Sequence, residues 1–188
     1  PIVGGLILLS IFPFLFGLSI NTFLPAFNRD VLMGGADDLG LLMTSMGFGA
    51  IAGSLVLAKL GSLKNKGNWV LITNALWGIG VAAFAITEVF FWSFLAIGFV
   101  GFISAINMSM NRSLVQLQVN QSMRGRVMSL DMMSHGLMPL GVVPIGYIAE
   151  TVSVEAGLAT SGAILFLITV ISGFLMPKIR AIDTGYKF

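Results

Sequence analysis

A histidine and an aspartate in the second half of the chain are the residues best suited to proton chemistry. Asp131 and His135 are four positions apart, so on a helix they share one face and their side chains can interact. Imidazole titrates near neutral pH, and an ionisable group inside a membrane is a functional hypothesis by default, so the pair could relay protons. In the structural alternative, Asp131 stabilises the positive start of its helix and His135 donates a hydrogen bond to a helix neighbour.

Two arginines precede that pair, on either side of a glycine. They are Arg124 and Arg126, with Gly125 between them. Guanidinium groups bind carboxylates in paired geometry, so the arginines could form a gate that closes in one conformation and opens in another. The alternative is that they anchor a loop at the membrane surface, as basic loop residues commonly do.

Small and polar residues interrupt two apolar stretches at helical spacing. Two sets recur at intervals of three, four or seven positions: Ser10, Gly17 and Asn21, and Ser104, Asn107 and Asn111. Each set therefore lies along one stripe of a helix. A buried amide in lipid needs a partner, which is cavity water, a substrate or a neighbouring helix. Bonds between helices contribute about 0.6 kcal/mol on average, and both interpretations stay open.

Most other chemistry has no support in the sequence. The chain has no Cys and one His, so it cannot form a disulfide, a thiolate nucleophile or a multi-histidine metal site by itself. Ser134 adjoins His135 and so points to a different face of a helix, which argues against a Ser–His catalytic pair. There is no phosphate-binding G-x-x-x-x-G-K-[ST] loop. We expect no metal, no cofactor and no enzymatic activity.

These residues are carried by six long apolar segments. The segments run roughly over 2–25, 40–58, 69–87, 91–111, 127–148 and 156–176. Each is near the ~20 residues that span a bilayer as a helix, and none alternates as a barrel strand would. Hydrophobic residues make up 56% of the chain and charged residues 10%, against about 25% in soluble domains. The sequence predicts an all-α integral membrane protein that forms one six-helix bundle over residues 1–188.

The basic residues predict how this bundle is oriented. Nine of the ten Lys and Arg residues fall in the second and fourth connections and the C-terminal tail. Cytoplasmic loops carry excess Lys and Arg, so these connections and both termini should face the cytoplasm in a multi-pass protein of the cell membrane. Topology accounts for the basic pI near 9.3, and no nucleic-acid partner is implied. The fourth connection, over 112–126, is amphipathic enough for an interfacial helix.

The two halves of the six-segment ladder resemble each other weakly. Glycines recur in the second segment, over 47–53, and in the fifth, at Gly136, Gly141 and Gly146. An inverted 3+3 repeat would place these two helices in corresponding positions, as in many transporters. Close packing of helices also selects glycine, so the pattern indicates such a repeat without requiring it.

Three motifs carry a resemblance to a known family. Residues 124–129 read RGRVMS ahead of Gly141 and Gly146, residues 39–42 read LGLL ahead of the glycines at 47–53, and Asn107 and Asn111 precede the run LVQ at 114–116. On these motifs the chain resembles the C-terminal half of a major facilitator superfamily transporter. The bacterial branch of siderophore exporters and macrolide-type efflux pumps is the most similar.

The resemblance implies a function. The first and fourth helices of such a bundle line the substrate cavity, so it assigns that role to Asn21, Ser104, Asn107 and Asn111. It favours the gate for 124–126 and leaves proton coupling at Asp131 and His135 as a candidate. The expected protein is half of a proton-driven exporter of amphipathic small molecules, working by alternating access. The alternative is a six-helix membrane scaffold without transport activity.

The same resemblance implies partners. Besides the lipid bilayer and a small-molecule substrate, we expect an N-terminal six-helix half of the same transporter or a second bundle. The chain starts at Pro1 without an initiator Met, which suggests part of a longer protein. The loop over 59–67 keeps the basic residues found in this family but lacks the acid that often accompanies them.

Overall fold

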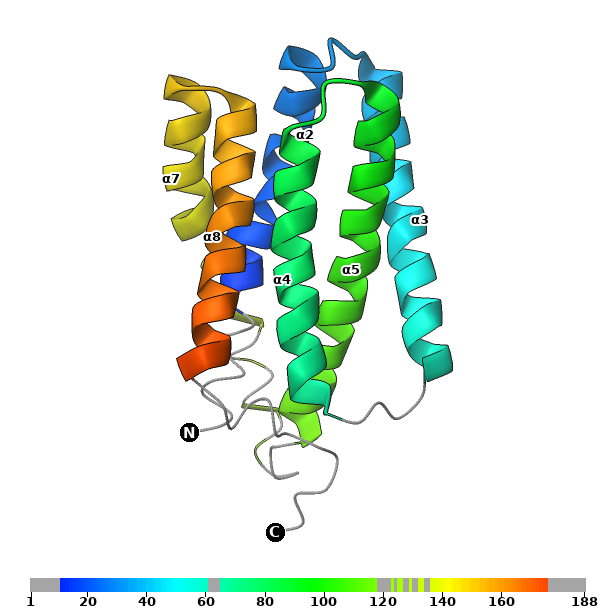
Figure 1. The fold of residues 1–188 in the computed structure, drawn as a ribbon, viewed down its shortest axis with the longest axis vertical. Coiled ribbons are helices and arrows are strands. Elements are labelled where there is room, and N and C mark those ends of the chain that lie inside the picture. The colour runs from blue at the N-terminus through cyan, green and yellow to red at the C-terminus, as the bar shows by residue number, and fades with distance from the viewer. Residues whose placement is uncertain are drawn as a thin grey trace.

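The computed structural model describes residues 11–60, 65–117, 123, 125–126, 129, 132–133 and 136–175. In these residues it is a bundle of helices without a β-strand (Figure 1). The elements are η1 (Pro13–Gly17), α2 (Ser19–Asp30), α3 (Ala36–Leu60), α4 (Lys66–Ala85), α5 (Phe90–Leu117), α7 (Met138–Thr151) and α8 (Val154–Leu175). The predicted all-α class is confirmed.

Four of the described helices are long and apolar enough to cross a membrane. They are α3, α4, α5 and α8, with 18-residue windows of mean hydropathy 1.8, 1.4, 1.8 and 2.1. Because only helices and closed barrels satisfy their backbone hydrogen bonds in lipid, this composition makes the chain a multi-pass membrane protein. Six spans and the inverted repeat remain predictions.

The first predicted segment contains an irregular helix. Five residues from Pro13 form a π-helical turn, and the Leu18 N–H donates to the Pro13 carbonyl at 2.9 Å. Pro13 has no N–H, so the backbone around it departs readily from regular α geometry. A regular helix then continues as α2 to Asp30, five residues beyond the predicted end at residue 25.

Two predicted boundaries are wrong for a physical reason. Helix α5 does not end at 111 but runs to Leu117, so its 28 residues are about 42 Å long at 1.5 Å per residue. The expected interfacial helix over 112–126 is therefore wrong for 112–117, where Leu114 is 1% exposed inside the bundle. The fifth predicted helix, over 127–148, is broken by a turn at 136–137 and resumes as α7, whose first turn holds Pro139.

Glycines set the packing of the two most extensive helix pairs. Helices α3 and α5 approach so closely that a Cβ on Gly101 would overlap the Met46 carbonyl, and one on Gly49 would overlap the Gly98 carbonyl. Helices α4 and α8 meet in the same way, and a Cβ on Gly78 would lie 2.7 Å from the Gly162 oxygen. Small residues allow such backbone contact between membrane helices. Gly49, within the glycine-rich segment 47–53, is thus a packing residue in this structure.

The irregular turn η1 fits into the bundle through two further glycines. A Cβ on Gly17 would lie 2.8 Å from the ring of Trp77 in α4, and one on Gly141 in α7 would overlap the Leu15 carbonyl. Trp77 is fully buried, and Phe27 of α2 packs on Phe84 of α4 with ring centroids 4.4 Å apart. The η1–α2 segment therefore lies against one face of α4.

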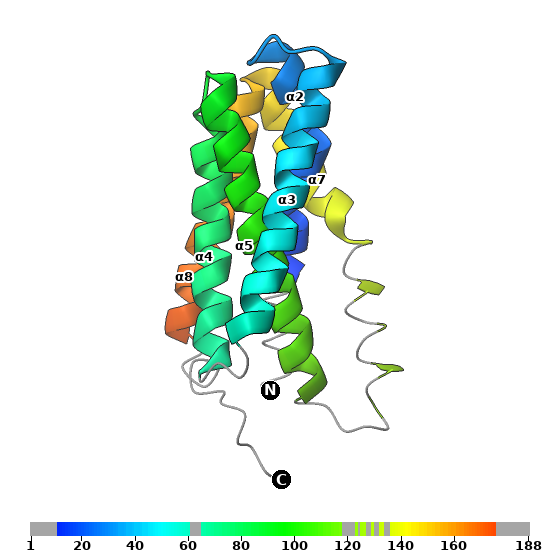
Figure 2. The same ribbon diagram turned by 90° about the vertical axis from the view of Figure 1, so that its right-hand side faces the viewer.

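Charged residues divide between the two ends of the bundle (Figures 1 and 2). The α2–α3, α4–α5 and α7–α8 connections lie at one end. That end carries one basic residue, Arg29, and these acidic ones: Asp30, Asp37, Asp38, Glu88, Glu150 and Glu155. The opposite end holds Lys59 and Lys66 at the α3–α4 connection. We call these the acidic end and the basic end.

Candidate functional site

The three polar residues predicted to line a cavity from α5 are all buried in the bundle. Ser104, Asn107 and Asn111 are 6%, 1% and 3% exposed. The Asn107 amide nitrogen donates to the Thr73 hydroxyl at 2.8 Å and to the Val70 carbonyl at 3.1 Å, both in α4. Asn107 therefore joins α5 to α4, which is the structural interpretation of its amide. Its role in a substrate path stays a prediction.

The other two residues of this stripe, Ser104 and Asn111, differ in their hydrogen bonding. The Ser104 hydroxyl donates to the Gly101 carbonyl of its own helix at 3.0 Å. The buried Asn111 Oδ1 has no hydrogen-bond partner among the described residues. An unpaired buried amide oxygen costs about 1–3 kcal/mol. Asn111 Oδ1 is thus the α5 acceptor best placed to gain from a bound water or a polar ligand group.

Asn21 lies in a different environment from the α5 stripe. It is exposed on α2, beside the exposed Thr22, whereas the α5 residues are buried. The bundle alone therefore does not bring Asn21 together with Asn107 and Asn111 on one surface. Asn21 could line the same cavity as Asn107 and Asn111 only if another part of the protein covered the exposed face of α2.

Sequence reasoning missed a polar contact at the irregular turn of the first segment. The Ser161 hydroxyl of α8 donates to the Phe16 carbonyl at 2.6 Å and lies 2.7 Å from the Ser19 hydroxyl. Ser19 also bonds the Phe16 carbonyl, at 2.5 Å. Pro13 and Gly17 signal an interruption there, but nothing in the sequence connects it to Ser161. The contact gives the Phe16 carbonyl, in the π-helical turn η1, hydrogen bonds from polar side chains of two segments.

The predicted gate and proton-coupling residues lie only partly within the described chain. Gly125 and Arg126 are described and exposed. Arg124, Asp131 and His135 lie outside the described residues. Both assignments therefore stay predictions. Within the described ranges no group of three or more His, Cys, Asp or Glu residues could hold a metal ion.

The acidic end carries an ion pair between neighbouring residues. The Arg29 Nε lies 2.7 Å from the Asp30 Oδ1, and both side chains are exposed. The hydrogen bond from Arg29 holds the pKa of Asp30 below its ordinary value. With Arg29 engaged in this way, the remaining acidic residues give this end a negative potential, which attracts cations and repels anions.

Known proteins match nearly the whole chain. The sequence profile of a family described as transmembrane secretion effector matches residues 3–185. A staphyloferrin A transporter of Staphylococcus aureus (strain NCTC 8325 / PS 47) is 26% identical over 164 residues. The aligned part is 87% of this chain but 41% of that transporter, so the chain spans less than half the length of this relative.

Proposed function

Because the chain belongs to the transmembrane secretion effector family of the major facilitator superfamily, we propose that it is half of a proton-driven exporter working by alternating access. The resemblance predicted from the motifs is confirmed at the level of the family, and family and relative alike point to transport rather than to an enzyme. The observation that carries the proposal is the profile match over 3–185, together with helices able to span a membrane. We propose amphipathic small molecules of the drug or siderophore type as substrates.

In this proposal the substrate path runs along the η1–α2 segment and α5. Asn21 is the exposed polar group on α2, and Asn111 has a buried oxygen without a partner in the described structure. Discontinuous membrane helices commonly frame substrate sites in transporters, and η1 makes the first segment discontinuous. Ser104 and Asn107 would support the wall of the path from behind, through their bonds within α5 and to α4.

A second six-helix bundle would cover the remaining side of this path. Helix α3 supports such a partner because only 17% of its most apolar window is buried, against 56% for α4 and 44% for α5. Its exposed residues include Phe48 and Ile51, and α7 exposes Leu140 and Tyr147. Both helices contact α2 or η1, so a bundle seated on them would also face the predicted path.

We further propose that the basic end faces the cytoplasm. Lys59 and Lys66 lie there, and cytoplasmic loops of membrane proteins carry an excess of such residues. Single cysteines introduced at Lys66 and at Glu88, on opposite ends, should react with an impermeant maleimide only from inside and only from outside, respectively. Labelling in the reverse sense would invert the proposed topology.

Transport is tested by flux in everted membrane vesicles with an imposed proton gradient. We expect uptake of an amphipathic cationic dye that an uncoupler abolishes. Asn111→Ala and Asn21→Ala should lower this flux at least tenfold with protein abundance unchanged, while Ser172→Ala on α8 leaves it unchanged. A scaffold would instead show no uncoupler-sensitive flux for the dye or for an iron-free siderophore, and the two variants would alter abundance alone.

The partner bundle is tested by the intact mass of the native polypeptide from its source membrane. A mass near twice 20.0 kDa would agree with a second bundle in the same chain. A mass near 20.0 kDa would require a separate bundle, which a cysteine at Phe48 should then capture by disulfide cross-linking. Active transport with neither a larger mass nor a captured bundle would contradict the paired arrangement, so both measurements accompany the flux assay.

A further inference from the structure

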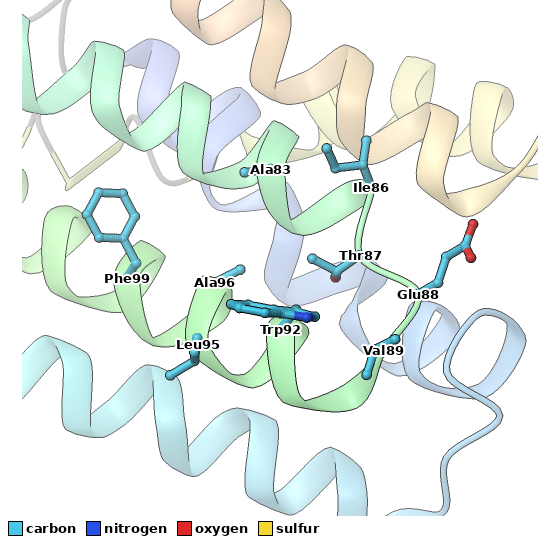
Figure 3. Close-up of a pocket in the computed structure, with 9 residues that line it drawn as sticks. All are labelled: Ala83, Ile86, Thr87, Glu88, Val89, Trp92, Leu95, Ala96 and Phe99. Carbon is cyan, nitrogen blue, oxygen red and sulfur yellow. The ribbon is translucent and has the colours of Figure 1, made fainter.

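A groove between α4 and α5 opens at the acidic end of the bundle. Its volume is about 630 Å³, and its walls are mainly apolar (Figure 3). Glu88, in the connection between the two helices, lies at one end of the groove, and Phe99 lies at the other. Trp92 and Leu95 line one side, and Ala83 lies across from them on α4. Ala83 and Ala96 make this space, because larger side chains at these positions would fill it.

The groove faces away from the proposed substrate path. The η1–α2 segment packs on the face of α4 that carries Trp77 and Phe84, both fully buried. Ala83, one position from Phe84, is exposed and lines the groove. Since neighbouring residues on a helix point about 100° apart, the groove opens on another side of α4 from the one that contacts α2. Its occupant therefore belongs to the surrounding membrane rather than to the path.

The groove is lined by an interfacial residue near the end of the bundle and by apolar residues deeper in, which matches the change from interface to hydrocarbon across one membrane leaflet. Trp92 is 61% exposed near the end of the bundle, where the amphipathic indole ring favours the membrane–water interface. Phe99 lies seven residues further along α5, about 10 Å deeper at 1.5 Å per residue, among exposed apolar side chains. The groove thus continues from the interface into the hydrocarbon layer, which is the course of a phospholipid with one chain in the groove.

The carboxylate of Glu88, at one end of the groove, favours some lipid headgroups over others. Glu88 is exposed and makes no ion pair within the described residues. The neighbouring Thr87 hydroxyl is already engaged with the Phe84 carbonyl at 2.7 Å and the Ser93 hydroxyl at 2.6 Å. A carboxylate accepts hydrogen bonds and cannot donate them, so it binds an ammonium group and repels a headgroup with net negative charge.

We propose that this groove is a binding site for a phospholipid with a primary ammonium headgroup, such as phosphatidylethanolamine. Its ammonium would donate to the Glu88 carboxylate, and one acyl chain would lie along Trp92, Leu95 and Phe99 between Ala83 and Ala96. A choline headgroup has no N–H to donate, and a glycerol headgroup leaves the lipid anionic. This inference goes beyond the proposed transport and does not require it; only the leaflet depends on the proposed topology.

Native mass spectrometry of the full chain in detergent tests the headgroup preference. We expect phosphatidylethanolamine to be retained at severalfold lower concentration than phosphatidylcholine or phosphatidylglycerol. Exposed charge pairs contribute modestly, so Glu88→Gln should reduce that preference about two- to fivefold. The matched control Glu150→Gln, at the same end but outside the groove, should leave it unchanged. Equal retention of the three lipids by the unaltered protein would overturn the proposal.

A photo-crosslinking experiment tests the groove itself. Phosphatidylethanolamine with a diazirine on one acyl chain should label the α5 peptide that contains Leu95 and Phe99. Ala83→Leu, which fills the groove, should abolish this labelling, while Ala163→Leu at an exposed position of α8 should not. Labelling spread evenly over the exposed faces of α3, α7 and α8 would exclude a lipid site in this groove. A second copy of the chain cross-linked at Trp92 would also exclude it, because that copy would then occupy the groove.

Discussion

Ser161 in α8 donates a 2.6 Å hydrogen bond to the carbonyl oxygen of Phe16, which lies 145 positions earlier in the irregular turn of the first segment. The Ser19 hydroxyl shares this acceptor, so two side chains bind one carbonyl at the break between η1 and α2. In the apolar surroundings of a membrane helix such a carbonyl needs partners. The contact therefore explains how a discontinuous helix is tolerated at this depth.

Replacing Ser161 with alanine should destabilise the contact between α8 and the irregular turn η1. We expect Ser161→Ala to lower the free energy of unfolding by about 1 kcal/mol, because one hydrogen bond is lost while Ser19 keeps the Phe16 carbonyl partly satisfied. Thermal unfolding in detergent measures the change. Ser172→Ala, further along the same helix, is the control and should have a smaller effect. Equal melting temperatures for the two variants would mean that the contact adds no stability.

Glycines on α3 and α5 should differ sharply in their tolerance of alanine. A Cβ on Gly101 would overlap the Met46 carbonyl, and backbone cannot move aside cheaply. We expect Gly101→Ala to cost about 1–3 kcal/mol through overpacking. A Cβ on Gly47 meets nothing within 4 Å, so Gly47→Ala should be neutral or stabilising by up to about 1 kcal/mol, because alanine favours helix.

The yield and melting temperature of purified protein measure this difference. If the bundle pairs with a second bundle through α3, Gly47→Ala would weaken that pairing, and its effect would appear in cross-linking yield while the bundle itself stays stable. Comparable losses of stability in both variants would contradict the close approach of α3 and α5.

The bond from Asn107 to Thr73 should behave as a coupled pair. Asn107→Ala removes two hydrogen bonds to α4, and Thr73→Val removes the hydroxyl acceptor. We expect each single variant to be destabilised and the double variant to lose less than the sum of the two. A coupling free energy of about 0.6 kcal/mol is typical of such bonds in membranes. A double-mutant cycle on unfolding free energies measures it, and strict additivity would contradict a direct interaction.

Periodicity and hydropathy predicted the helices well because the bilayer imposes their length. The cores of α3, α4, α5 and α8 all fall inside predicted segments. The ends were predicted less well, since α5 runs on to Leu117 where Leu114 and Val115 gain burial inside the bundle rather than in lipid. No local pattern distinguishes these two sources of apolar contact.

The candidate site was harder to predict, because spacing on one helix does not reveal the neighbouring helix. Ser104, Asn107 and Asn111 do share one stripe, as predicted, and all three are buried. That the amide of Asn107 meets α4 depends on tertiary packing. The same is true of Ser161, which lies in another segment from the carbonyl that it binds.

The predicted gate at 124–126 can be separated from simple anchoring by exchanging one basic residue for another. A gate needs the planar guanidinium for paired hydrogen bonds, whereas an anchor needs only positive charge near the headgroups. We therefore expect Arg126→Lys to lower transport about as strongly as Arg126→Gln, by tenfold or more, with abundance and topology retained. Lys66→Arg, at the same end of the bundle, should leave transport unchanged. Full activity of Arg126→Lys alongside loss in Arg126→Gln would assign Arg126 to anchoring, because charge alone would then suffice.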